Sequence, residues 1–403
     1  MTDDLNRQDA KDSKGRLPDG WRCVRLGEVC SVHPGQHILE SDYNRESIGI
    51  GYLTGPADFG LMYPSVTKWT NKPKAWCEPG DILVTVKGAG VGKANLAPEE
   101  RVAIGRQLMA VRPKRGVADR RFIYCFILMQ LFNLQSRALG STVPGLGRED
   151  LESLAVPLPP ISDQQRIAAI LNEQMAAVER ARAAAEPRLE AAKALPAAYL
   201  RAVFNSPEAQ KWSKKRLGDI LRLRKEVVHP RDNPTGRATF VGLEHLESVT
   251  GRRIGAVEVD MATLTGRKPR FYKGDIVYGY LRPYLNKVWV AELDGLCSVD
   301  QYVYSVDQTK ARTEFVGWFM RSPVYLTRAP IGFSPGQLPR IRTEEVSSVE
   351  INLPSLEEQE QIGAMVNARL ARVDRGRKTL EEELAAINAL PAALLRRAFS
   401  GEL

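Results

Sequence analysis

The chain contains a long internal repeat. Residues 158–204 align without a gap on residues 353–399, at an offset of 353 − 158 = 195, and 21 of the 47 aligned positions are identical. A match of this length within one chain of 403 residues is not coincidence. It predicts that the protein is built from two similar halves, because self-similarity at a fixed period is typical of repeated structural units.

Shorter matches lie upstream of the repeated segment in each half. Residues 21–29 correspond to 212–220 at an offset of 191, and residues 79–83 correspond to 273–277 at an offset of 194. Because the offset drifts, insertions and deletions must separate the matching patches. Each half therefore consists of a variable segment of roughly 130 residues followed by a more constrained one.

The variable segments have the composition of irregular, β-rich structure, with frequent Gly and Pro between β-branched runs. The clearest predicted strands are 82–86, 275–281, 287–293 and 301–306. A shorter helix is expected in each half, around residues 121–134 and 313–326.

The repeated segment has the pattern of a long helix with one apolar stripe. Apolar residues recur every seven positions in both copies: Leu171, Val178, Ala185, Ala192 and Tyr199 in the first, and Val366, Val373, Leu380, Ile387 and Leu394 in the second. Such a stripe requires a partner helix. Since each copy would otherwise expose its own stripe, we expect the two copies to pack against each other.

Three prolines interrupt this pattern. Pro187 lies within the first stripe, and Pro196 and Pro391 occupy equivalent positions in the two copies. A proline inside a helix removes a hydrogen bond and costs about 3 kcal/mol or bends the helix. We therefore expect bent or two-piece rods of about 40 residues, or about 60 Å each.

These patterns predict an α+β fold in which two β-rich domains are separated by a pair of long antiparallel, coiled-coil-like helices, with an internal pseudo-two-fold repeat. The predicted division of the chain is a flexible tail (1–16), a first β-rich domain (17–157), a central helical spacer (158–210), a second β-rich domain (211–352) and a C-terminal helical spacer (353–403).

Composition adds weaker constraints. A net charge of +9 is compatible with a nucleic-acid partner but does not require one. The five cysteines form no C-x-x-C pair, so the sequence indicates neither a disulfide framework nor a zinc site. The longest apolar run, residues 122–134, is too short to cross a bilayer, and the polar first sixteen residues do not resemble a signal peptide. We expect a cytoplasmic protein with no membrane partner.

With these features in place, the chain resembles the specificity subunit of type I restriction–modification systems. Four phrases carry the resemblance: LPDGWRCVRLGEV (17–29) with its partial repeat KKRLGDIL (214–221), PGDIL with its repeat KGDIV, LPPISDQQRI (158–167) with its repeat LPSLEEQEQI (353–362), and the closing AFSGEL (398–403). The first copy of the closing phrase, AVFNSPE, departs from the pattern, as does Pro187. Each phrase is weak alone, but their order, duplication and spacing are specific.

The resemblance implies functions that the residues themselves do not show. The β-rich domains would be target-recognition domains for double-stranded DNA, and the chain itself would be non-catalytic. Its partners would be two adenine-methyltransferase subunits and two motor–nuclease subunits. The resemblance also implies that this chain holds no cofactor, whereas the partners bind S-adenosylmethionine, ATP and magnesium.

Candidate DNA-binding residues combine cations for phosphates with planar polar groups for base edges. The candidates are Lys87, Lys93, Arg106, Gln107, Arg112 and Arg148 in the first variable segment, and Arg267, Lys268, Arg270, Arg282, Tyr284, Asn286, Lys287, Gln301, Arg340 and Arg342 in the second. The runs GRKPRFYKGD and LRPYLNK are favoured, because cations and aromatics alternate there.

Three motifs that suggest chemistry are incomplete. Residues 88–94 approximate a phosphate-binding loop, but Lys87 replaces the first Gly and Ala94 lacks the hydroxyl that binds magnesium. His33 and His37 have helical spacing, but Pro34 and Gly35 lie between them. Residues 233–236 (NPTG) begin like an amino-methyltransferase motif but lack its second proline and its aromatic residue. We therefore expect no catalytic residues and no metal site.

Two other interpretations stay open at this point. The first is a nuclease or methyltransferase with a helical appendage, which would modify DNA without a partner. The second is a helical structural adaptor, whose assembled complex would bind DNA weakly and without salt dependence.

Overall fold

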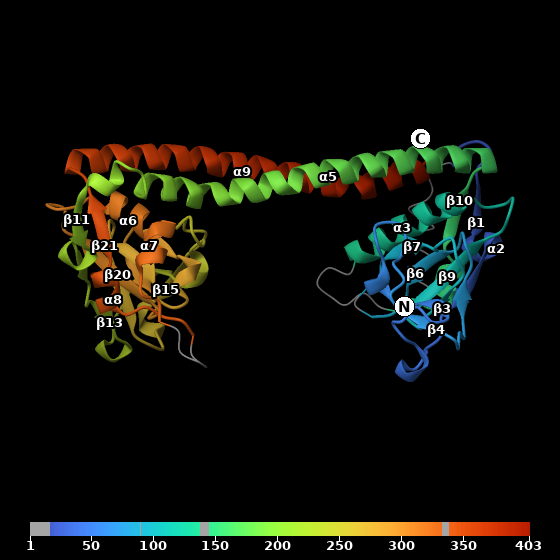
Figure 1. Ribbon diagram of the computed structural model, residues 1–403, viewed down its shortest axis with the longest axis horizontal. Helices are drawn as coiled ribbons and strands as arrows, with labels where there is room; N and C mark the ends of the chain where they lie inside the picture. The colour runs from blue at the N-terminus through green and yellow to red at the C-terminus, as the bar shows by residue number, and fades with distance from the viewer. Residues whose placement is uncertain (1–16, 89, 138–144, 333–337) are drawn as a thin grey trace. The chain divides into compact units, whose positions relative to one another are not determined.

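A computed structural model describes residues 17–88, 90–137, 145–332 and 338–403 (Figure 1). The predicted flexible tail, residues 1–16, lies outside the described residues. The chain forms two compact units: unit 1 comprises Met1–Ala184 with Leu384–Leu403, and unit 2 comprises Ala185–Glu383. This division cuts both long helices in their middle, whereas the sequence-based division keeps each helical spacer whole. The five-part division therefore remains a proposal.

Unit 1 is built mainly from short strands. Its strands are β1 (Arg22–Arg25), β2 (Cys30–Pro34), β3 (Ile50–Leu53), β4 (Trp69–Thr70), β5 (Trp76–Cys77), β6 (Ile82–Thr85), β7 (Ala94–Leu96), β8 (Val102–Ile104), β9 (Leu108–Pro113) and β10 (Ala155–Leu158). Its helices are α2 (Leu26–Val29), α3 (Arg120–Arg137), α4 (Arg148–Glu152), the first half of α5 (Ile161–Phe204) and the end of α9 (Leu356–Phe399). The predicted strand at 82–86 and the helix at 121–134 are confirmed.

Unit 2 has corresponding elements. Its strands are β11 (Ser213–Arg216), β12 (Leu221–Leu223), β13 (Val227–Val228), β14 (Arg237–Val241), β15 (Val257–Asp260), β16 (Lys268–Phe271), β17 (Ile276–Gly279), β18 (Val288–Val290), β19 (Gly295–Cys297), β20 (Gln301–Val306) and β21 (Glu350–Leu353). Its helices are α6 (Thr313–Arg321), α7 (Pro323–Arg328), α8 (Thr343–Ser348) and most of α9 (Leu356–Phe399). The three strands predicted here are confirmed, and the helix predicted at 313–326 is divided into α6 and α7.

The two units share one strand topology. Unit 1 has sheets of order β2-β9-β6-β7 and β4-β3-β8-β5 and the pair β1-β10, whereas unit 2 has β12-β20-β17-β18, β13-β16-β19-β14-β15 and the pair β11-β21. Both units contain one parallel strand pair, β3 with β8 and β14 with β19, at matching places. Only β13 has no counterpart among the described strands. The duplication seen in the sequence therefore extends through the variable segments, where it was hardly visible.

The long helices pack against each other in both units, as predicted. In unit 1, Arg166 donates to the backbone oxygen of Leu403 at 3.2 Å and Arg182 donates to Asn388 at 2.9 Å, so the two helices run antiparallel there. In unit 2, Arg188 contacts Glu383 at 3.2 Å with the same polarity. The stripe residues Leu171, Val178, Ala185 and Ala192 are buried in this packing.

Helix α5 is continuous from Ile161 to Phe204 through Pro187 and Pro196, and α9 is continuous through Pro391. Of the two expected forms, bent or two-piece rods, the two-piece form is therefore wrong. Because Pro187 has no N–H, the carbonyl of Ala183 lacks its helical hydrogen-bond donor. Both residues are exposed, so water can solvate this carbonyl and the helix need not end at Pro187.

A buried glutamine fixes the start of each long helix. Gln164 accepts a hydrogen bond from the Asp119 backbone N–H at 2.8 Å and donates to the backbone oxygens of Val117 and Pro159. Gln359, at the equivalent position, accepts from the Arg312 backbone N–H at 2.8 Å. The identical glutamine in the two copies thus joins the long helix to the start of α3 or α6.

Candidate nucleic-acid interface

Three backbone segments meet at the same end of the main sheet in each unit. In unit 1, the backbone N–H of Val86, just after β6, donates to the oxygen of Gln107 at 2.9 Å, and its own oxygen accepts from Leu146 at 2.9 Å. In unit 2, Tyr280 makes the equivalent bonds with Asp300 at 3.1 Å and with Ile341 at 3.2 Å. We call this end the loop edge: residues 86–88, 90–93, 105–107 and 145–147 in unit 1, and residues 280–287, 298–302 and 338–342 in unit 2.

The loop edge of unit 1 gathers four of the predicted residues. Lys87, Lys93 and Arg106 are exposed, and Gln107 is half-buried. The side-chain amide of Gln107 packs against Gly55 and Gly88. A Cβ atom at Gly55 would lie 2.0 Å from the Gln107 Oε1, and a Cβ atom at Gly88 would lie 3.3 Å from its Nε2. Three exposed cations around a positioned amide form an arrangement suited to phosphates and a base edge.

The loop after β6 is not a phosphate-binding loop. It joins the antiparallel strands β6 and β7, and within it Val91 donates to the oxygen of Gly88 and Lys93 donates to that of Gly90. A phosphate-binding loop leads from a strand into a helix and leaves its N–H groups for the phosphates. Ala89 lies outside the described residues.

The other two predicted residues of unit 1 are engaged in ion pairs. Arg112 forms two hydrogen bonds of 2.8 Å with Asp81, the buried Asp of the PGDIL phrase, which also caps the turn at Glu78. Arg148 is bound by Glu152 at 2.7 Å. Unit 2 repeats the first arrangement, because Asp275 of the KGDIV phrase pairs with Arg224 and caps the turn at Tyr272. This pair explains why the Gly-Asp phrase recurs.

The loop edge of unit 2 is centred on two stacked tyrosines. The rings of Tyr280 and Tyr302 lie 4.3 Å apart with an interplanar angle of 20°. Burial chiefly raises the pKa of Tyr280, and Asp300 raises it further, while the positive charges of Arg340 and Arg267 oppose the shift. A β-bridge between Leu281 and Arg340 places Arg340 beside the strand end that carries Tyr280.

Five of the predicted residues in unit 2 are exposed: Arg267, Arg282, Tyr284, Arg340 and Arg342. Arg282 has a left-handed backbone (φ 52°), and its N–H donates to the oxygen of Pro339, which fixes the loop that carries it. The two tyrosines were not predicted, although the recurring Tyr in YGYLRP and QYVYSV near the strand ends could have indicated them.

The remaining five predicted residues of unit 2 have partners within the protein. Asn286 is 1% exposed and donates to the Arg321 oxygen at 2.7 Å, and Gln301 is 2% exposed and accepts from the Ser298 N–H at 2.9 Å. Lys287 donates to the Leu243 oxygen, Arg270 pairs with Glu226 at 3.1 Å, and Lys268 lies over the Phe240 ring at 4.9 Å. These contacts favour a supporting role for Asn286 and Gln301 in particular.

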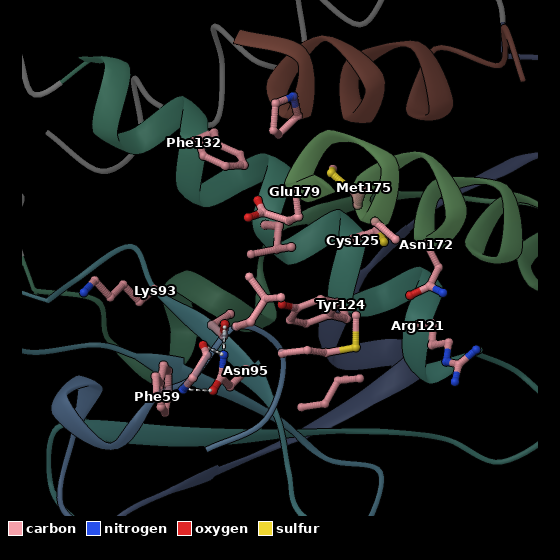
Figure 2. Close-up of a pocket in the computed structure, with 18 of the residues that line it drawn as sticks. Phe59, Lys93, Asn95, Arg121, Tyr124, Cys125, Phe132, Asn172, Met175 and Glu179 are labelled. Carbon is pink, nitrogen blue, oxygen red and sulfur yellow. Dashed lines mark hydrogen bonds between the residues drawn. The ribbon is translucent and has the colours of Figure 1, made fainter. Parts of the chain in front are cut away.

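A recess lies beside the loop edge of unit 1 (Figure 2). It has a volume of about 780 Å³ and lies between α3, which contributes Tyr124 and Phe132, and α5, which contributes Met175 and Glu179. Equivalent helix positions line a smaller recess of about 490 Å³ in unit 2, where Leu370 replaces Met175 and Asp374 replaces Glu179. The two units thus share this feature as well as their strand order.

The comparisons with known proteins agree with this architecture. Residues 18–184 match the family model of the type I restriction modification DNA specificity domain. The EcoDI specificity subunit of Escherichia coli, a type I restriction enzyme component, is 27% identical over 426 aligned positions, which cover 97% of this chain and 90% of that protein. The putative MjaX specificity subunit of Methanocaldococcus jannaschii is 33% identical over 160 positions, or 39% of this chain and 37% of that protein.

Over almost its whole length, the chain is therefore similar to the specificity subunits of type I restriction–modification systems. Solved structures show the same fold. One chain from a study of complex assembly and conformational transition of the type I R-M system has a TM-score of 0.77 at 20% identity, covering 96% of this chain and all of that one. The HsdS subunit from Thermoanaerobacter tengcongensis has a TM-score of 0.59 at 18% identity, covering 97% and 99%.

A specificity subunit is the non-catalytic, DNA-specifying part of a type I enzyme, and it works with other subunits. Burial raises the pKa of the Cys30, Cys77, Cys125 and Cys297 thiols to about 12. Among the described residues, no group of three or more His, Cys, Asp or Glu side chains could hold a metal ion. Nor is any described helix long and apolar enough to cross a membrane.

The two remaining motif fragments lie in ordinary local structure. His33 is on β2 and hydrogen-bonds to Ser31 at 2.9 Å, so it has no helical relation to His37. Asn233 ends a short helical turn in a left-handed conformation (φ 46°), and Gly236 follows with φ 90°. The NPTG residues therefore form an exposed turn.

Proposed function

We propose that this specificity subunit recognises a bipartite, asymmetric double-stranded DNA target, and that the loop edge of each unit reads one half-site. The observation that carries the proposal is the recurrence of one backbone junction with different side chains. Val86 and Tyr280 make equivalent hydrogen bonds. Around them, unit 1 presents Lys87, Lys93 and Arg106, whereas unit 2 presents arginines around two tyrosines. Two loop edges with the same backbone hydrogen bonds and different exposed side chains are suited to two different half-sites.

The exposed residues of the two loop edges are the proposed DNA-contacting set. Arginine grips guanine in a bidentate manner, glutamine suits adenine, and lysines neutralise phosphates without reading sequence. Gln107 is the base-reading candidate in unit 1, because its half-buried amide packs closely against Gly55 and Gly88. In unit 2, Arg282 and Arg340 flank the tyrosine pair and are the corresponding candidates.

The proposed role of α5 and α9 is to fix the spacing of the half-sites. Each helix is continuous for 44 residues and contributes to both units. Two readers related by an approximate two-fold axis would contact DNA about one helical turn apart, or roughly 10 bp centre to centre, with an unread spacer between. Lengthening or shortening both helices by the same number of residues should change the spacer and leave both half-sites unaltered.

The remaining proposals concern partners. Two adenine-methyltransferase subunits would dock on the outer helix surfaces, where Met365 is half-exposed in a groove of about 690 Å³ and Ile170 holds the equivalent position in unit 1. Two motor–nuclease subunits would join for restriction. S-adenosylmethionine, ATP and magnesium would bind to those partners and none to this chain, and the assembly would act on DNA in the cytoplasm.

A segment exchange tests the proposal. Residues 17–157 are replaced by the corresponding segment of a relative with another target, and the hybrid is assembled with its methyltransferase partner. Methylated sites are then mapped on genomic DNA. The proposal predicts that one half-site changes while the other half-site and the spacer stay the same. A change in both half-sites would contradict independent reading.

A further inference from the structure

A short hairpin loop in unit 2 connects a long helix to the loop edge. Residues 247–252 form the tip of a hairpin that is closed by a bridge between Leu246 and Arg253. Glu247 and Arg252 hold the tip together, because the Arg252 guanidinium donates two hydrogen bonds of 3.2 Å to the Glu247 carboxylate. We call residues 247–252 the linking loop.

Four charged side chains join the linking loop to α9. Arg252 lies 3.6 Å from Asp374, and Arg377 lies 3.8 Å from Glu247. Arg377 in turn binds Asp374 at 2.7 Å and Glu381 at 2.7 Å, and its side chain is only 16% exposed. The charges alternate in sign across the contact. Because Arg377 is only 16% exposed, water screens its charge less than that of an exposed arginine.

The other side of the linking loop is bound to the loop edge. The Val249 N–H donates to the oxygen of Asn286 at 3.0 Å, and Asn286 ends the segment that carries Arg282 and Tyr284. Gly251 approaches the start of β18 so closely that an added Cβ would lie 2.0 Å from the Val288 oxygen. The linking loop is therefore packed against the end of the segment 280–287 and the start of β18.

The backbone of the linking loop is strained where it makes this contact. Val249 has φ 68°, a left-handed conformation that β-branched residues rarely adopt. Such a conformation persists only where the surroundings impose it, and it is typical of functional sites. Here the imposing contacts are the Asn286 oxygen on one side and the Glu247–Arg252 pair on the other.

Unit 1 lacks this connection at the equivalent place. Its hairpin, closed by a bridge between Phe59 and Pro64, has the tip sequence Gly-Leu-Met-Tyr, which contains no charge. Glu179 and Arg182 hold the helix positions of Asp374 and Arg377 and form the same helix pair at 2.7 Å, but Arg182 binds Asn388 of the other helix where Arg377 contacts Glu247 of the linking loop. Unit 1 thus has the same helix charges and no loop partner for them.

We propose that Arg252, Asp374 and their ion-pair partners Glu247 and Arg377 are positioning residues that fix the orientation of the second reading surface relative to the spacer helix. They act through the linking loop and do not contact DNA. They set which spacer length the complex accepts, while the bases of the half-site are read by other residues. This inference rests on the proposed bipartite, fixed-spacing function.

The test uses the complete chain assembled with its methyltransferase partner. The DNA probes are duplexes that contain the wild-type target, as determined by methylation mapping, with the natural spacer or with a spacer one base pair shorter or longer. The variants are Asp374→Asn, Arg252→Gln and the double substitution. The matched control is Glu179→Gln, which makes the same charge change at the equivalent helix position of unit 1.

We expect the double variant to lose roughly three- to fivefold of its discrimination against the altered spacers, a loss that two partly exposed ion pairs can account for. Its preference among half-site bases should stay as in the wild type, and Glu179→Gln should keep full spacer discrimination. A purely structural role would lower the melting temperature without changing spacer discrimination. If the double variant is too unstable, Asp374→Asn alone is the readout.

The possible outcomes distinguish failure of the positioning role from failure of the proposed function. If the wild type discriminates between spacers and the variants discriminate equally well, the positioning role is wrong and the proposed function stands. If Glu179→Gln relaxes spacer choice as much as Asp374→Asn, the loop contact is not the cause and the inference fails. If the wild type itself accepts all three spacers equally, the fixed-spacing function fails together with the inference.

Discussion

The ring of Phe399, near the end of the second long helix, lies 5.0 Å from the ring of Phe122 at the start of α3. The same relationship recurs in unit 2, where Phe204 at the end of α5 lies 5.3 Å from Phe315 on α6. Helix α5 begins in unit 1 and ends in the core of unit 2, and α9 does the reverse. Each core is therefore completed by a helix whose other end belongs to the other unit.

Replacing Phe399 by Ala should destabilise unit 1 by about 3–5 kcal/mol, because it removes a buried aromatic side chain and leaves a cavity against Phe122 and Phe126. Chemical denaturation of the purified chain measures the change. Leu390→Ala on the same helix is the control, because Leu390 is 43% exposed and should cost far less. Equal losses for the two variants would show that the end of α9 is not part of that core.

Replacing Gln164 by Ala should cost about 1–3 kcal/mol, since it leaves the Asp119 N–H and the Pro159 carbonyl without their partner. The neighbouring Gln165→Ala serves as control, because Gln165 is exposed. Hydrogen exchange of the Asp119 amide gives a local readout, and we expect it to accelerate in Gln164→Ala only. Unchanged protection of that amide would contradict the assigned hydrogen bond.

Substitutions of Lys87 and Arg112 should have different effects: the first on DNA affinity, and the second on the free energy of unfolding. Lys87→Met should weaken DNA binding by the assembled complex at all sequences and lower the salt slope of log K by about 1, with stability changed by less than about 0.5 kcal/mol. Arg112→Met should instead destabilise the chain by about 1–3 kcal/mol, because it leaves the buried Asp81 carboxylate unpaired. Salt titrations and denaturation curves of both variants check this, and a reversed pattern would refute the assignment of the two cations.

The linking loop should make the stability of unit 2 depend on pH. The hydrogen bond from Arg377 is the largest cause that lowers the pKa of Asp374. Burial alone would raise the pKa of Glu247, but Thr250, Arg252 and Arg377 together lower it. A carboxyl whose pKa is lower in the folded state contributes stability above its unfolded pKa of about 4 and loses it as the pH falls through the folded value.

Thermal unfolding of the wild type and of Asp374→Asn between pH 7 and pH 3 measures this dependence. The wild type should be the more stable at pH 7. The difference between the two should shrink as the pH falls below about 4, because Asp374 then takes up a proton in the unfolded state first and in the folded state only at still lower pH. A difference that is constant over the whole range would show that the carboxylate charge of Asp374 does not stabilise unit 2.

The helical part of the fold was predictable because its sequence pattern is periodic. The seven-residue stripe through Leu171 and Val178 predicted both the length of the helices and their pairing. The effect of Pro187 was not predictable from the pattern, because it depends on whether the carbonyl that loses its donor faces water. The shared strand order was only partly visible, since strand pairing is fixed by contacts far apart in sequence.

The candidate site was predicted less completely, for a different reason. Residue type and spacing do not show whether a side chain already has a partner. Asn286 and Gln301 have the right chemistry for reading adenine, but both are buried, whereas Lys87 and Arg106 in similar loops are exposed. The buried role of Gln164 and Gln359 could have been predicted from the sequence, because an identical polar residue at the start of two amphipathic helices indicates a buried hydrogen bond.

The most direct test of the central claim is methylation mapping of genomic DNA from cells that express this specificity subunit with its partner subunits. We expect one motif made of two different short half-sites, one on each side of an unread spacer of constant length. A single contiguous motif, or a motif whose two half-sites are identical, would contradict the proposal that two distinct loop edges read DNA at a fixed separation.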